Sequence, residues 1–218
     1  TRGAGAGGNL TIETGRFLLQ GTALLSANTF DQGAGGNLTV RASEGAVLVG
    51  TGFNSLQQFL GGVLSGQVKP SDRIGGLFAV TAGDGQGGNV SIDTGLLRLQ
   101  NGAIAFAPVF GRGSGGNLHI RAHSVDAVGS GLLVGTSFGS QGNAGNLTIT
   151  GNQVTIQDGS ILSGATFGSG HGGHIAIDAS DFVNISRTLP DALIPTGIAN
   201  NSFGTGTGGN VRISTGRL

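Results

Sequence analysis

The feature that most constrains this chain is a phased internal repeat. A Gly-Asn step, once Gly-His, is followed by alternating apolar residues seven times, at intervals of 28, 52, 28, 29, 28 and 36 residues. The lead residues of the units are Asn9, Asn37, Asn89, Asn117, Asn146, His174 and Asn210. Four intervals are nearly equal and two exceed them, so the sequence predicts seven copies of one unit with two insertions.

Each unit contains three short apolar runs. In the first unit, Leu10 and Ile12 alternate with polar residues, Phe17 and Leu19 form a second run, and residues 24–30 form a third. Alternation with a period of two is typical of half-buried strands. The repeat therefore predicts three short strands in every unit of about 28 residues.

The repeated strands are expected to stack on one another rather than to form hairpins. A hairpin fold needs recurring tight turns such as Asn-Gly, and Asn101-Gly102 is the single instance. Parallel crossovers are nearly always right-handed. The prediction is thus an all-β, right-handed parallel β-helix, with residues 1–218 forming one segment of a longer rod. The insertions, at about 52–76 and 188–196, should leave it as corner loops.

Stacking predicts which side chains lie above one another. The lead asparagines, with His174 in place of one of them, should form a polar ladder at a corner. A buried aromatic column with a gap at Ala82 should lie seven or eight residues before each lead residue. Its members are Phe30, Phe110, Phe138, Phe167 and Phe203.

Composition narrows the range of functions. The chain has 46 glycines, no cysteine and a formal net charge of zero. Balanced charge gives no long-range attraction for nucleic acid. The absence of cysteine excludes disulfides and thiolate metal sites, and no apolar stretch approaches the roughly 20 residues that span a bilayer.

The units resemble a known family. Gly36-Asn37-Leu38-Thr39-Val40-Arg41 and Gly209-Asn210-Val211-Arg212-Ile213-Ser214 are similar to the repeat region of filamentous-haemagglutinin-like exoproteins, particularly those of cyanobacteria. The resemblance implies a passenger of two-partner secretion, with an outer-membrane transporter as its partner. It also implies a secreted or cell-surface location and a role in adhesion or aggregation. The family's secretion signal is expected outside this chain.

No catalytic, cofactor-binding or metal-binding residues are expected. The Gly-x-Gly-x-x-Gly patterns recur at one phase of the repeat, which indicates corners rather than nucleotide loops. Asp84 alone approaches the place of a calcium-roll ligand, and a calcium site needs several converging oxygens. Calcium-dependent folding stays open.

The main alternative to a structural rod is a carbohydrate-active β-helix similar to polysaccharide lyases or hydrolases, which needs clustered carboxylates.

The first insertion contains the chain's one lysine and an apolar pattern consistent with a short helix. Two hypotheses apply to it. It could form a binding loop for a surface glycan or protein receptor, through Phe59, Lys69, Asp72 and Arg73. Alternatively, Leu56, Phe59 and Leu60 could simply pack over the coil, which is favoured because loops rarely leave that much apolar surface bare.

Overall fold

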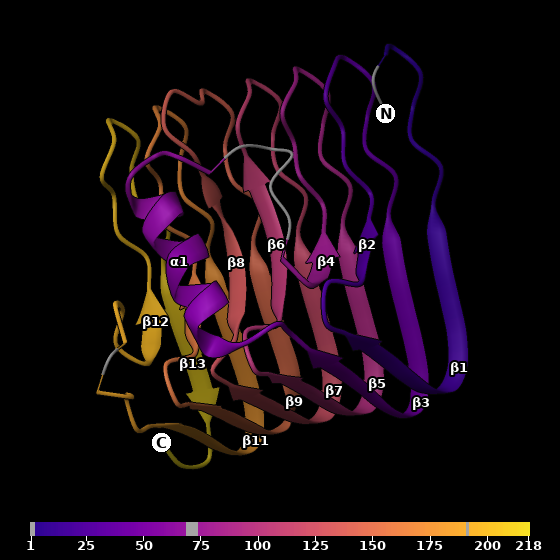
Figure 1. The fold of residues 1–218 in the computed structure, drawn as a ribbon, viewed down its shortest axis with the longest axis vertical. Helices are drawn as coiled ribbons and strands as arrows, with labels where there is room; N and C mark the ends of the chain where they lie inside the picture. The colour runs from indigo at the N-terminus through magenta and orange to yellow at the C-terminus, as the bar shows by residue number, and fades with distance from the viewer. Residues whose placement is uncertain (1–2, 69–73, 191) are drawn as a thin grey trace.

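The computed structural model describes residues 3–68, 74–190 and 192–218. The chain winds into a parallel β-solenoid whose coils lie side by side along one axis, from the N-terminal coil to the C-terminal coil (Figure 1). The lead residues of adjacent uninterrupted coils are 28 or 29 positions apart. The predicted all-β solenoid with a unit of about 28 residues is confirmed.

One sheet is made of long strands, each the first strand of its coil. Its order follows the chain, and every neighbouring pair is parallel. The strands are β1 (Leu10–Gln20), β3 (Leu38–Val49), β5 (Val90–Gln100), β7 (Leu118–Val128), β9 (Leu147–Gln157), β11 (Ile175–Ser186) and β13 (Val211–Thr215).

A second parallel sheet of shorter strands faces the first across the core. It also follows chain order, from β2 to β12. The strands are β2 (Leu24–Ser26), β4 (Gly76–Phe78), β6 (Ile104–Val109), β8 (Gly131–Thr136), β10 (Ile161–Ser163) and β12 (Gly197–Ala199). Beyond it, single bridges such as Thr29 to Thr81 and Thr136 to Thr166 continue the stacking toward the glycine corner, which is the glycine-rich turn before each lead residue, for example residues 83–88.

The structure divides each coil differently from the three separate strands expected. The first two predicted runs, around Leu10 and Phe17, belong to the single continuous strand β1. The chain bends inside this strand, where its register with β3 shifts between Thr14 and Arg16. Such an irregularity absorbs the bend without ending the ladder of hydrogen bonds, so no turn separates the two runs.

The core lies between the two sheets and runs the length of the solenoid. Alternate residues of the long strands point into it, as Val90 and Ile92 do in β5, while the residues between them face outward. Stacking places like residues in columns, since Leu38 pairs with Val90 and Val90 with Leu118. Burial of these aliphatic side chains, at roughly 1.5–3 kcal/mol each, is the main source of stability.

The first insertion forms one α-helix, α1 (Phe53–Leu64). Leu56, Phe59 and Leu60 are spaced to share one helix face, and all three are buried. In Figure 1, α1 lies across the sheet of short strands. Among the described residues, no helix has the length and hydropathy that crossing a membrane requires.

The close approach of successive coils at the glycine corner generates a stability prediction. A Cβ atom at Gly88 would lie 1.8 Å from the carbonyl oxygen of Gly36 in the preceding coil, whereas one at Gly8 would meet nothing within 4 Å. Gly88→Ala should therefore lower the free energy of unfolding by at least about 2 kcal/mol, because the backbones would have to separate. Urea unfolding measures this. Gly8→Ala is the matched control, and an equal loss in the two variants would contradict the prediction.

Candidate functional site

The lead residues form a continuous polar ladder along one corner. In each rung, the backbone N–H of a lead residue donates to the side-chain Oδ1 of the lead asparagine in the preceding coil. The donor–acceptor distances are 2.8 Å (Asn37 to Asn9), 2.9 Å (Asn89 to Asn37), 2.8 Å (Asn117 to Asn89), 2.9 Å (Asn146 to Asn117) and 2.9 Å (His174 to Asn146). The side-chain amide of Asn89 also donates to Oδ1 of Asn37 at 3.3 Å, and that of Asn117 donates to Oδ1 of Asn89 at 3.1 Å. The ladder thus ties backbone to side chain at every step.

His174 continues the ladder with different chemistry. Its Nδ1 accepts the backbone N–H of Asn210 at 2.8 Å, in the place where an asparagine would present Oδ1. This geometry requires an unprotonated Nδ1, since the imidazolium form donates from both nitrogens. Histidine can replace asparagine here because both offer an acceptor at the same reach from the backbone.

A line of hydroxyl groups holds the glycine corner from inside. Thr29, Thr81, Thr136 and Thr166 are buried at equivalent positions. The hydroxyl of Thr166 donates to the carbonyl of Gly170 at 2.7 Å and lies 2.6 Å from the hydroxyl of Thr136. This bond closes a turn within one coil, as the bond from the Thr29 hydroxyl to the carbonyl of Gly33 does. The hydroxyl of Thr81 makes no hydrogen bond to another described residue, and Val109 takes the equivalent position in the coil between Thr81 and Thr136.

The predicted aromatic column exists in part: Phe167 is buried, whereas the prediction of burial is wrong for Phe138 and Phe203, which are exposed. Phe138, Phe167 and Phe203 stack with ring centroids 4.9 and 4.8 Å apart, and Phe203 is 56% exposed. The inward position is taken by the residue before Phe167, namely Thr166, so the ring points to the outer side. Phe30 and Phe110 are partly buried at the corresponding places, with Ala82 between them.

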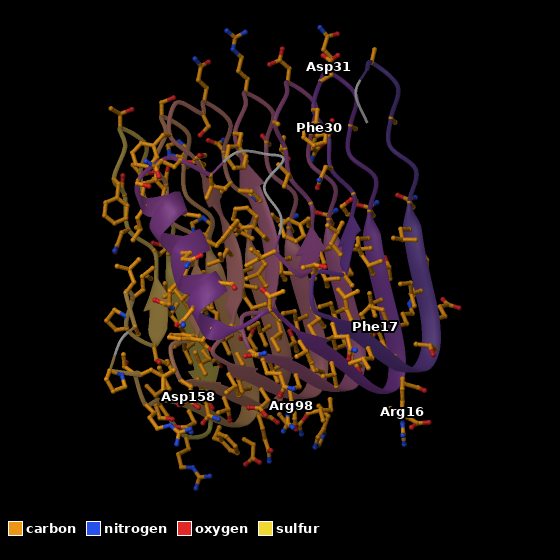
Figure 2. All side chains as sticks on the ribbon, in the orientation of Figure 1. Arg16, Phe17, Phe30, Asp31, Arg98 and Asp158 are labelled. Carbon is orange, nitrogen blue, oxygen red and sulfur yellow. The ribbon has the colours of Figure 1, made fainter. Side chains whose placement is uncertain are left out.

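Ion pairs join neighbouring coils on the outer surface of the long-strand sheet and, in the case of Asp158 and Arg187, directly after the ends of β9 and β11. They join Arg41 to Glu13 (2.6 Å), Arg16 to Glu44 (2.6 Å), Arg98 to Asp126 (2.9 Å), Arg121 to Asp93 (3.8 Å), Arg212 to Asp178 (3.5 Å) and Arg187 to Asp158. Opposite charges in vertical register are what cross-strand pairing favours. Figure 2 shows Arg16, Arg98 and Asp158 along this side of the coils. Most of these groups are exposed, so the pairs mainly fix register.

The ion pair between Arg187 and Asp158 is bidentate. Arg187 donates from Nε to Oδ1 and from Nη2 to Oδ2, the latter at 2.5 Å. These hydrogen bonds hold the pKa of the Asp158 carboxyl below its ordinary value of 3.8, while burial opposes the change. The same contact raises the pKa of Arg187. Asp158 is thereby fixed as a carboxylate.

The residues proposed for a binding loop divide into two groups. Phe59 is buried on α1, with its ring edge-on to Phe106 at 5.1 Å between centroids, so it packs against the short-strand sheet. Lys69, Asp72 and Arg73 lie outside the described residues. The part of the first insertion that the structure describes therefore covers the coils.

The two insertions meet over the short-strand sheet. The backbone N–H of Leu193, in the second insertion, donates to Oε1 of Gln57 on α1 at 2.6 Å. An apolar cavity of about 270 Å³ lies beside this junction. Its walls come from the end of α1, from β6 and β8, from residues 193–195, and from Phe110, Phe167 and Phe203 of the aromatic column.

The sequence analysis favoured packing of the first insertion over the coil but did not identify which strands it covers. Every residue of β6 and of β8 is buried, on both sides of each strand. The signal was present, because residues 103–109 and 131–134 are nearly continuous apolar runs rather than alternating ones. Such runs are typical of strands covered on both faces.

The described residues contain no group of three or more His, Asp or Glu side chains arranged to hold a metal ion. His171 lies with its Nδ1 2.6 Å from the hydroxyl of Thr207, and Asp181 accepts a hydrogen bond from Gln153 at 3.0 Å. These polar groups thus bridge adjacent coils, as the ion pairs do.

In comparisons with known proteins, no family model, no curated protein and no solved structure matches this chain.

The histidine rung can be tested by replacement. His174→Ala removes the acceptor for the Asn210 amide and should cost about 0.5–1.5 kcal/mol of unfolding free energy, because one net hydrogen bond is lost. His174→Asn should retain stability, since Oδ1 can take the place of Nδ1. Hydrogen exchange of the Asn210 amide should accelerate only in the alanine variant. His119→Ala, at an exposed site on β7, is the control, and an unchanged Asn210 amide in His174→Ala would contradict the rung.

The Asp158 pair predicts a pH dependence with a definite sign. A carboxyl whose pKa is lower in the folded state stabilises the fold above its ordinary pKa and loses that effect as the pH falls through the folded value. Asp158→Asn should therefore be less stable than the parent protein at pH 7, and the difference should shrink below about pH 3.8. Urea unfolding at several pH values measures it. Asp84→Asn, at an exposed carboxylate, is the control; a constant Asp158 difference from pH 7 to pH 2 would exclude the effect.

Proposed function

We propose that this chain is a structural and adhesive rod segment of a large secreted or cell-surface bacterial exoprotein, without catalytic activity. The observation that carries the proposal is the axial ladder from Asn9 to Asn210. It repeats one set of contacts at every coil, with no catalytic constellation needed to account for it. A scaffold that extends by adding equivalent units is suited to spanning distance from a cell surface.

The use of charge supports the same proposal. A polysaccharide lyase or hydrolase on a β-helix needs carboxylates free to serve as acid, base or calcium ligands. Here the carboxylates of Glu13, Glu44, Asp93, Asp126, Asp158 and Asp178 are engaged by arginines of adjacent coils. Asp158 in particular has a lowered pKa, which is opposite to what a general acid requires.

The resemblance to filamentous-haemagglutinin-like repeats supports the location. It supplies the proposed route, two-partner secretion through an outer-membrane transporter, and the proposed role in adhesion or aggregation. The polar outer surface of the long strands is compatible with such contacts, because rows of exposed side chains offer a repeating surface to a glycan or to another rod.

The location and role can be tested in the organism that carries the gene. An antibody against residues 1–218 should label intact cells or the culture medium, and protease treatment of intact cells should remove the cell-bound signal. Deletion of the gene should reduce cell aggregation or attachment to a surface. Labelling only after lysis would contradict a surface location, and unchanged aggregation and attachment would contradict the adhesive role.

The enzyme alternative is tested separately. The purified chain should release no reducing ends and no unsaturated products from a panel of neutral and acidic polysaccharides, with and without calcium. Product formation that is lost in an Asp31→Asn or Asp84→Asn variant would overturn the rod proposal in favour of a carbohydrate-active protein.

A further inference from the structure

The cavity between the two insertions has the construction of a ligand site. Leu60, Val63 and Leu64 of α1 form one wall, and Phe106 and Leu133 of the short-strand sheet lie opposite. Residues 193–195 contribute to the wall at the junction of the insertions. Figure 1 shows that α1 comes from an early part of the chain yet lies over later coils, so distant segments build the cavity together.

The walls define the charge of a ligand. Among the described residues that line the cavity, none carries a formal charge, and the few polar residues in its walls, such as Ser163 and Asn201, are neutral. A charged group would lose its hydration here without a compensating partner, which is costly. A ligand of this cavity is therefore neutral and largely apolar.

The aromatic rings define its shape. Phe106, Phe110, Phe167 and Phe203 all line the cavity, and Phe167 and Phe203 are stacked with only 11° between their planes. A planar ring can add to this arrangement by stacking or by edge contact, which a flexible aliphatic chain cannot do. Leu64, Leu193 and Phe203 are exposed at the same place, so a bound ring would also remove apolar surface from water.

The volume defines its size. An apolar cavity of about 150 Å³ in a protein interior holds one benzene molecule. At about 270 Å³, this cavity has room for roughly twice as much. We propose that it binds a neutral aromatic molecule of about two fused rings. The inference is independent of the rod function.

The binding test uses 6-acetyl-2-dimethylaminonaphthalene, a neutral naphthalene probe whose emission shifts to shorter wavelength in apolar surroundings. Titration of the intact chain should give a saturable shift with one site per chain. Naphthalene should displace the probe at lower concentrations than n-octanol, a flexible aliphatic competitor. The absence of a saturable shift, or displacement by octanol at least as effective as by naphthalene, would overturn the proposal.

Three variants locate the site. Phe203→Leu, at an exposed residue, keeps apolar area but loses a ring and should weaken binding about 2- to 10-fold. Val63→Trp should weaken it more than about 10-fold by filling the cavity from α1. Phe30→Leu is the matched control, because Phe30 holds the same place in its coil but does not line the cavity, and Figure 2 shows it near the N-terminal coils.

The variants together decide whether the probe binds in this cavity. Thermal unfolding first shows which variants keep the fold, and the exposed position of Phe203 keeps that comparison usable if Val63→Trp does not fold. Binding by Phe203→Leu that equals the parent chain, or an equal loss in Phe30→Leu, would overturn the assignment of this cavity.

Discussion

The whole structure depends on hydrogen bonding that runs along the axis of the solenoid. Most residues of β5 pair with β3 on one side and with β7 on the other, at offsets along the chain of 52 or 51 residues to β3 and 28 residues to β7. Equivalent residues therefore lie directly over one another, and every column must be filled by side chains that tolerate their own repetition. Aliphatic residues meet this condition in the core, asparagine meets it in the corner ladder, and threonine meets it among the buried hydroxyl groups of the glycine corner. Glycine meets it where a side chain would strike the backbone of the next coil, as at Gly88.

This constraint also explains how much the sequence could predict. Register is written into the spacing of Asn9, Asn37 and the later lead residues, so the solenoid, the ladder and the positions of the insertions follow from the repeat. The orientation of the phenylalanine column does not follow from spacing. It depends on whether Thr166 or Phe167 faces inward, and period-two alternation alone leaves that choice open when both neighbours can be buried. The hydroxyl bond from Thr166 to Gly170 decides it by closing the turn from inside.

The docking of α1 could not be predicted for a different reason. The helix itself is visible in the spacing of Leu56, Phe59 and Leu60, but its partners belong to coils that come much later in the chain. Phe53, at the start of α1, lies against Gly129 and Gly159, and Phe59 packs on Phe106. These contacts do not recur at the spacing of the repeat, so the repeat does not predict them. The continuous apolar runs of β6 and β8 indicate only that something covers that face.

The two faces of the solenoid consequently have different capacities for change. On the long-strand face, each side chain has a neighbour in the coil before it and in the coil after it. A substitution at Arg41 therefore changes the surroundings of both Glu13 and Asp93. The residues of the insertions do not have to pair with equivalent residues in the neighbouring coils. After 52 residues instead of 28, Asn89 still donates to Asn37 at 2.9 Å, and after 36 residues Asn210 still reaches His174. A corner can thus gain a helix, and with it a cavity between distant coils, while the axial register resumes unchanged. For a protein of this architecture, selective binding is expected to arise at such corners, because they are the places where new side chains can be added without repetition.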